Sequence, residues 1–154
     1  MRQLPHNDTL DWPAHPYSEY LRIELSSEFN LNAAHTGPGL YTDADFCPLS
    51  NADQIIAFEP VASDELAVED WRRGKGLSPD SRDRRYHYFV YVVPSSPPRK
   101  LYSNSEDQIP GYDLRRQRSD LCFRFYVPGY NIIPSRSDTV RVPVEVLARA
   151  LASH

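Results

Sequence analysis

The sequence predicts a mainly β protein: an antiparallel β-sandwich of about five to seven short strands with a short C-terminal helix. Three observations lead to this fold class. Short segments that alternate apolar and polar residues, or are rich in β-branched and aromatic residues, recur along the chain. The 14 prolines stand between these segments, where prolines end strands. A clear helical stripe occurs only near the C-terminal end. The alternative is an α+β fold with one antiparallel sheet.

The chain of 154 residues has the length of one compact domain. Its composition, with 40% hydrophobic and 25% charged residues, is that of an ordinary globular protein. Residues 1–18 carry three prolines among polar residues, and we expect them to form an extended N-terminal arm. Residues 19–154 are expected to form a single β-rich domain.

The first half of the chain contains two predicted strands. Residues 19–25 alternate apolar and polar side chains, which predicts a half-buried strand. Residues 26–52 are predicted to be turns and loops because of their glycines, prolines and the polar stretch 42–45, with room for a short strand around Phe46. Residues 54–59 form the second strand candidate.

A first helix is predicted over residues 63–74. Ser63 is a suitable N-cap, acidic residues follow it at the positive end of the helix dipole, and Gly74 ends the segment. The segment is also short enough to be a loop. The basic residues of 72–85 are predicted to form an exposed connection.

The strongest strand pattern of the chain covers residues 85–93, which are almost all β-branched or aromatic. Because both faces of this segment are apolar, we expect a central strand that is buried on both sides. Residues 95–98 are predicted to form a turn, residues 100–103 can restart a strand, and residues 104–118 are predicted to be loop.

Two further strands and a helix are predicted near the C-terminus. Residues 120–127 alternate, and residues 139–142 are predicted to form the last strand. Pro143 then suits the first position of a helix over 143–151, because its missing N–H costs nothing there. The apolar stripe of this helix consists of Val144, Leu147, Ala148 and Leu151.

Charge is distributed unevenly along the chain. Residues 1–70 carry a balance of −11 and residues 71–154 a balance of +7, which gives the net charge of −4. Internal ion pairs between the halves are the simpler interpretation, and a charged face for a protein partner is the other.

The arginines of 82–85 beside the aromatic residues of 86–89 are similar to a surface that binds single-stranded nucleic acid, but core packing explains these aromatic residues better. With an acidic net charge, we therefore expect no nucleic-acid partner. The apolar runs are too short to predict a membrane-spanning helix.

Cys47 and Cys122 are the only cysteines. In an oxidising compartment they are expected to form a disulfide, which would stabilise the fold by about 4.5 kcal/mol in the chain-entropy model. In a reducing compartment they would be two unpaired thiols.

The sequence contains no recognisable catalytic, cofactor or metal pattern, and the five histidines show no metal-ligand spacing. We therefore expect no cofactor, no metal and no catalytic residues. The enzyme alternative is a small hydrolase or lyase that uses His35 with Asp43 or Asp45. Tyrosines next to glycine- or proline-rich turns are typical of protein recognition, although they can also pack as turn anchors. The predicted partner-binding residues are Tyr41, Asp43, Asp45, Tyr112, Asp113 and Tyr130.

Four segments of the C-terminal third occur in a recognisable order: residues 101–103, 111–114, 119–125 and 137–143, the last followed by a short helix. In this order the chain resembles the small periplasmic or lipoprotein immunity proteins of type VI secretion systems. The resemblance implies a non-enzymatic protein that binds a cognate secreted bacterial toxin and occludes its active site. It supplies no catalytic residues to carry over.

The resemblance also implies a location. Such proteins are periplasmic, with a signal peptide and in some cases a lipid anchor in the full-length precursor. Residues 1–8 lack the apolar core of a signal peptide, so the sequence would be the mature form. A cytoplasmic location is the alternative, and a secreted effector or an assembly component is a further alternative for the function.

Overall fold

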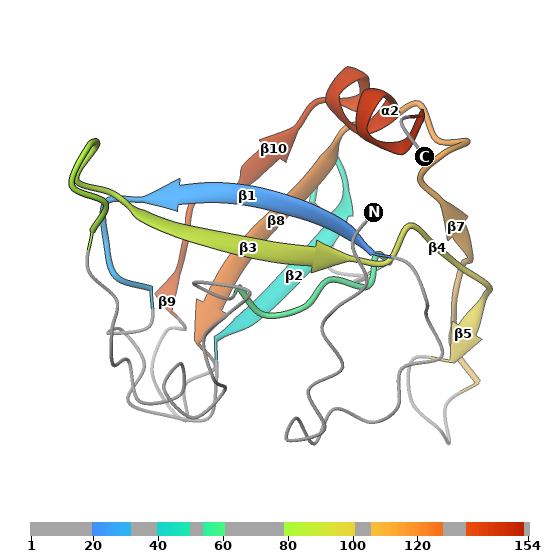
Figure 1. The fold of residues 1–154 in the computed structure, drawn as a ribbon. Coiled ribbons are helices and arrows are strands. Elements are labelled where there is room, and N and C mark those ends of the chain that lie inside the picture. The colour runs from blue at the N-terminus through green and yellow to red at the C-terminus, as the bar shows by residue number, and fades with distance from the viewer. Residues whose placement is uncertain are drawn as a thin grey trace, which may run out of the picture.

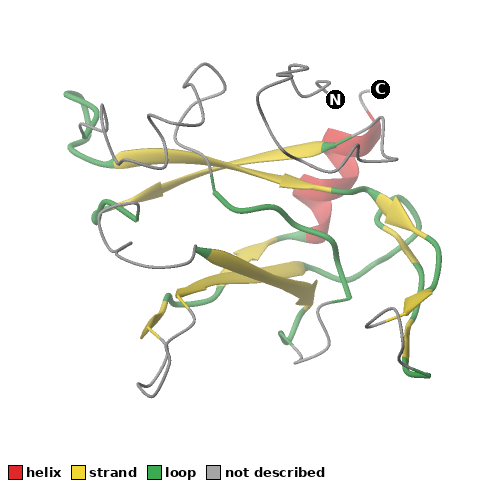
Figure 2. Ribbon diagram, turned by 90° about the horizontal axis from the view of Figure 1, so that it is seen from below, coloured by secondary structure: helices red, strands yellow, loops and turns green. Residues whose placement is uncertain are grey.

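The fold is given by a computed structural model, which describes six stretches of the chain. These are residues 20–31, 40–49, 54–60, 79–100, 106–127 and 135–152. They form a mainly β structure of antiparallel sheets in two layers with a C-terminal helix, which confirms the predicted fold class (Figure 1 and Figure 2). The predicted arm over 1–18 and the predicted helix over 63–74 lie outside the described stretches.

The first sheet pairs β1 (Leu21–Ser27) with β3 (Tyr86–Val92) in antiparallel register. Both strands were predicted from their local pattern. The other edge of β3 is lined by the segment 56–58, which exchanges backbone hydrogen bonds of 2.9 Å with it. β3 therefore has a neighbour on each side, as expected for a central strand. Its predicted burial on both faces is confirmed only in part, because Tyr91 is buried on the second face while His87 and Phe89 are half-buried.

The segment 54–60 is not the regular strand that its sequence predicts. It makes one isolated bridge, between Ala57 and Val92. The Ile55 amide donates to the Ala44 carbonyl in the second sheet at 3.2 Å, while the Ile56 carbonyl accepts from Val93 at 2.9 Å. Because its hydrogen bonds are divided between two sheets, the segment cannot continue as a strand of either.

The second sheet contains four strands: β2 (Tyr41–Phe46), β8 (Leu121–Val127), β9 (Ser135–Arg136) and β10 (Val140–Val142). β2 pairs with one edge of β8, and β10 with the other. β9 pairs with the far end of β8, next to Tyr126 and Val127. The strands predicted over 120–127 and 139–142 are confirmed.

β2 corrects a prediction, because its polar residues 42–45 were expected to form a turn. The strand pairs with β8 over six positions, and its acidic side chains have partners. The Asp43 carboxylate binds Arg124, and Oδ1 of Asp45 accepts the amide of Phe46 at 2.7 Å. Cross-strand pairing and ion pairing thus outweigh the turn preference of aspartate.

The main core lies between the two sheets, which cross in Figure 1. Val90 and Val92 of β3 face Leu121 and Phe123 of β8, and all four side chains are fully buried. Burying one such side chain contributes about 1.5–3 kcal/mol. The inward residues of β8 alternate with outward ones, as its sequence pattern predicts.

The C-terminal helix α2 (Val144–Ala152) lies at the end of the second sheet where β8 begins (Figure 1). Leu147 and Leu151 pack into the main core. The helix begins one residue later than predicted, because Pro143 directly precedes it. One residue of the predicted apolar stripe, Ala148, is exposed.

Within the described stretches, no helix has the length and apolar character needed to cross a membrane.

Two small ladders correct the predicted turn at 95–98 and the predicted loop at 104–118. β4 (Ser95–Ser96) pairs with β7 (Tyr112–Asp113), and β5 (Arg99–Lys100) pairs with β6 (Gln108–Ile109). These two-residue strands have no periodicity that a sequence pattern could reveal. Their close packing depends on Gly111, since a Cβ there would lie 2.8 Å from Pro98.

Candidate functional site

The outer face of the second sheet gathers most of the predicted partner-binding residues that the structure describes. Opposed residues on antiparallel strands point to the same face, so the register arranges this face in rows. The first row is Tyr41, Tyr126 and Arg136, the second is Asp43 and Arg124, and the third is Asp45, Cys122 and Arg141. These eight residues define the outer face below.

The first row combines two aromatic rings with a cation. The rings of Tyr41 and Tyr126 stack with centroids 5.6 Å apart and an interplanar angle of 28°. Tyr41 is 41% exposed, one of the few large apolar side chains exposed to that degree in the described stretches. Arg136 is also exposed, at the position opposite Tyr126 on β9. This row therefore presents an aromatic surface next to a cation.

The second row is an ion pair that holds two strands together. Nε and a terminal nitrogen of Arg124 both donate to Oδ2 of Asp43 at 2.9 Å. The two side chains are largely buried, with 20% and 15% of their surfaces exposed. The pair therefore fixes the middle of the outer face.

The third row contains the disulfide. Cys47, just after β2, is bonded to Cys122 of β8, with 5.1 Å between the two Cα atoms, which confirms the predicted bridge. The bridge joins residues that are 75 positions apart in the sequence. Asp45 beside it is only 5% exposed, whereas the side chain of Arg141 is 70% exposed. Disulfides of this kind are typical of proteins in oxidising compartments.

Asp120 lies at the end of the outer face, just before β8. Its Oδ1 accepts the Val144 amide at 2.8 Å, and its Oδ2 accepts from Arg141. The backbone hydrogen bond from Val144, followed by the bond from Arg141, lowers the pKa of the Asp120 carboxyl below its usual range. The carboxylate thus links the outer face to the start of α2.

Two of the predicted contacts organise turns: Tyr112 is buried, and Asp113 is half-buried. Tyr112 is 5% exposed, its hydroxyl donates to the Val93 carbonyl at 3.0 Å, and it accepts the Ile56 amide at 3.0 Å. It is therefore a turn anchor. Oδ1 of Asp113 accepts the Arg115 amide at 3.0 Å and organises the turn after β7. Neither residue belongs to the outer face.

Of the residues that the enzyme alternative names, the structure describes only the two aspartates. Asp43 is engaged with Arg124, and Asp45 is buried beside the disulfide. Tyr130 and His35 lie outside the described stretches.

The aromatic patch considered for nucleic-acid binding is largely part of the packing. Tyr88 is fully buried, and Phe89 packs under Arg22, whose guanidinium lies 4.8 Å from the ring centroid.

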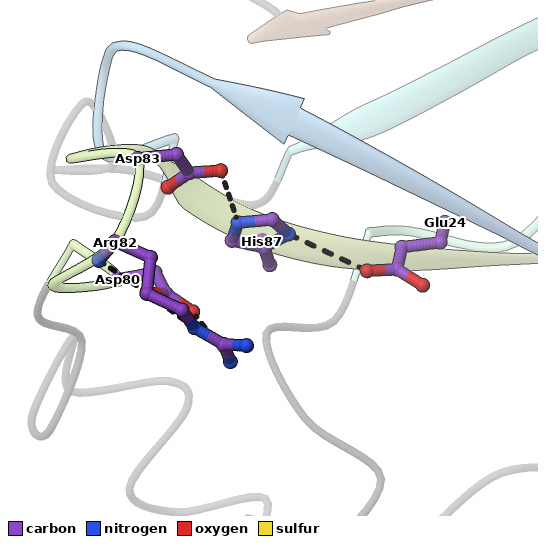
Figure 3. Close-up of a pocket in the computed structure, with 5 residues that line it drawn as sticks. All are labelled: Glu24, Asp80, Arg82, Asp83 and His87. Carbon is purple, nitrogen blue, oxygen red and sulfur yellow. Dashed lines mark hydrogen bonds and ion pairs between the residues drawn. The ribbon is translucent and has the colours of Figure 1, made fainter.

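A second group of polar residues, which the sequence did not indicate as a group, lines an open depression of about 500 Å³ (Figure 3). It consists of Glu24, Asp80, Arg82, Asp83 and His87. Nε2 of His87 lies 2.9 Å from Oδ2 of Asp83, and Nδ1 lies 3.4 Å from Oε1 of Glu24. These side chains lie on the outward face of the first sheet and on the loop before β3.

In this second group the pKa of the histidine is raised and the pKa values of two aspartates are lowered. The hydrogen bond to Asp83, with a smaller effect from Glu24, raises the pKa of His87. Backbone hydrogen bonds from Arg85 and Arg82 lower the pKa values of Asp83 and Asp80. All three effects favour the charged forms.

This second group does not have the geometry of a serine–histidine–aspartate site. Ser26 lies opposite His87 in the ladder, so a nucleophile is in the correct neighbourhood. Both ring nitrogens of His87, however, face carboxylates, and neither is left to accept a proton from Ser26. Only the pairing of β1 with β3 brings Glu24 and His87 together, so the sequence offered no local signal for them.

In the stretches that the structure describes, no three histidine, cysteine or acidic side chains are grouped so that they could hold a metal ion. Comparisons of the chain with protein-family models, curated proteins and solved structures found no match. The outer face and the His87 group are therefore interpreted from their own chemistry.

Proposed function

We propose that this protein is a non-enzymatic inhibitor that binds a secreted protein toxin through the outer face of the second sheet. The observation that carries the proposal is the row of Tyr41, Tyr126 and Arg136, which offers a stacked aromatic pair beside an exposed arginine. Tyrosine and arginine are the residue types that most often dominate the energy of protein interfaces.

The rigidity of the outer face supports this role. The Asp43–Arg124 pair joins β2 to β8 next to the Tyr41 row, and the Cys47–Cys122 bridge joins the same two strands at the other end of the face. A surface that is already ordered loses little conformational entropy on binding, so more of the contact energy contributes to affinity. The guanidinium of Arg141 at the other end of the face is paired with Asp120 but largely exposed, so its remaining N–H groups can contact the partner.

The proposed compartment is the periplasm. The disulfide supports an oxidising location outside the cytoplasm. The resemblance of the C-terminal third to periplasmic immunity proteins of type VI secretion systems gives the finer assignment. Under this proposal the partner is the cognate toxin, and inhibition occurs because the bound protein covers the active site of the toxin.

The test is binding to the toxin encoded by the gene adjacent to this one. Isothermal titration calorimetry of the two purified proteins should give tight binding with one-to-one stoichiometry. An activity assay should show that an equimolar amount of this protein inhibits the toxin. Full toxin activity in the presence of excess protein would overturn the proposed function.

A further inference from the structure

The loop of residues 79–85 is built around two aspartates. Oδ1 of Asp80 accepts the Arg82 amide at 2.7 Å, and Oδ1 of Asp83 accepts the Arg85 amide at 2.9 Å. The Asp80 amide donates to the Arg85 carbonyl at 2.7 Å, which closes the loop. Arg84 has a φ of 60°, a left-handed conformation that a non-glycine residue adopts only when its surroundings enforce it. The loop is therefore a compact unit that can be held or released as a whole.

His87 connects this loop to β1. Its Nε2 faces Asp83 in the loop, and its Nδ1 faces Glu24 in the strand, so the imidazole lies between two carboxylates on different elements (Figure 3). Ionised carboxylates can only accept hydrogen bonds, and a neutral imidazole has a single N–H. Both contacts can therefore be hydrogen bonds only when the ring carries two protons.

The remaining charges around His87 favour this doubly protonated form. Asp80, from the loop, adds a negative charge near the ring, although Arg82 is paired with it at 3.4 Å. Arg85 bonds to Ser26 at 3.4 Å and to Glu28 at 3.1 Å, which makes a second connection from the loop to β1. Histidine is the side-chain type that ordinarily changes its charge between pH 5 and 8, so His87 supplies the pH-sensitive part of the attachment.

We propose that His87 acts as a proton-operated clamp, which ties the 79–85 loop to Glu24 of β1 when its ring is protonated and releases this link when the ring loses a proton. Deprotonation leaves one N–H for two carboxylates. The Glu24 contact is the longer one, so it is released while the bond to Asp83 persists. The clamp lies on the first sheet, so it is independent of the toxin-binding role proposed for the second sheet.

The pH range follows from the direction of the shift. The pKa of His87 is raised in the folded protein, so the clamp is fully closed below the usual histidine pKa of 6.5. It opens as the pH rises through the higher pKa of the folded state. The link between the loop and Glu24 should therefore be closed in mildly acidic conditions and open in alkaline conditions.

The experiment is an NMR titration of the full chain between pH 5 and 9. Histidine ring signals and the backbone amides of 80–85 are followed together, and the His87 signals are assigned by their loss in His87→Gln. We expect a His87 pKa above 6.5, loop amides that shift with the same midpoint, and no such loop transition in His87→Gln.

Two matched variants separate the clamp from general electrostatics. Glu24→Gln removes one carboxylate that faces the ring, and it should lower the pKa of His87 and the loop midpoint together. Glu28→Gln removes an equally charged neighbour that contacts Arg85 instead, and it should shift the pKa much less. If His87→Gln does not fold, this pair decides alone. A His87 pKa at or below 6.5, or equal effects of the two glutamate variants, would overturn the clamp.

Discussion

The carboxylate of Asp120 caps α2 from a distant part of the chain: its Oδ1 accepts the amide of Val144 at 2.8 Å. The first N–H groups of a helix have no partner within the helix, and a side chain that accepts one of them stabilises the helix. Here the cap comes from the residue before β8, so it also fixes how the helix joins the second sheet. The same carboxylate pairs with Arg141 of β10.

We expect Asp120→Ala to lower the urea midpoint, and Asp120→Asn to lower it less, because the amide oxygen of asparagine still accepts from Val144. The lowered pKa of Asp120 makes the effect pH-dependent. The difference from the wild type should be complete above pH 3.8, the usual pKa of the group, and should vanish as the pH falls through the lowered value. A difference that grows in acid would contradict this role for Asp120.

The disulfide should provide a large share of the stability. Reduction, or the Cys47→Ser/Cys122→Ser double variant, is expected to lower the free energy of unfolding by about 4.5 kcal/mol, because an open chain has more unfolded conformations. Denaturant titrations with and without reductant measure this effect. The double variant is the control, since reductant should leave it unchanged. Two titratable thiols in denatured, unreduced protein would show that the bridge is absent.

Substitutions on the outer face should weaken binding of the toxin without destabilising the fold. Tyr41→Ala and Arg136→Ala are each expected to reduce toxin affinity at least about tenfold, while stability changes by less than about 1 kcal/mol. Calorimetric titration and thermal melts measure the two quantities separately. Phe29→Ala is the matched aromatic control, since Phe29 is 78% exposed and follows β1 by two residues, and Lys100→Ala is the control for charge. Equal losses in the controls would mean that another surface contacts the toxin.

The Asp43–Arg124 pair should show measurable coupling because both side chains are largely buried. In a double-mutant cycle with Asp43→Ala and Arg124→Ala, we expect each single variant to be destabilised by about 1–3 kcal/mol, since each leaves an unpaired charge. The double variant should lose less than the sum of the two. Added salt should change the coupling little, because buried pairs are weakly screened. Additive losses would show that the two residues act independently.

Gly111 should be intolerant of a side chain. A Cβ at this position would lie 2.8 Å from Pro98 and 2.9 Å from the Ser96 carbonyl oxygen, so alanine must displace backbone. We expect Gly111→Ala to cost about 1–3 kcal/mol. Thermal melts measure the loss, and Ser95→Ala on the paired strand serves as the control, because its side chain is exposed. A melting temperature equal to that of the control would show that the ladder adapts.

Local patterns were sufficient for the elements with strong periodicity. β3, β8 and the joined pair β10 and α2 follow directly from alternation, β-branched content and Pro143. β2 could not be predicted in this way, because the charge of Asp43 is neutralised by Arg124, which lies 81 positions away in the sequence. No local sequence pattern indicates the pairing of Asp43 with Arg124.

The candidate site was also predictable from the sequence only in part. Tyr41 and Tyr112 both lie beside turns in the sequence, yet one is on the outer face and the other is in the core. The His87 group depends on the register of β1 with β3 and was missed. The charge asymmetry is partly explained, because Asp43–Arg124 and Glu28–Arg85 each join the acidic first half to the basic second half.

The short segment around Ile55 has a consequence for how the molecule comes apart. The Ile55 amide donates to the second sheet, and the Ile56 carbonyl accepts from the residue that follows β3 of the first sheet. Separating the two layers therefore breaks at least one of these hydrogen bonds. We expect the two layers to unfold together, as one cooperative unit. In hydrogen exchange, the slowest amides of β3 and β8 should therefore exchange at a common rate, as parts of a single global unfolding event.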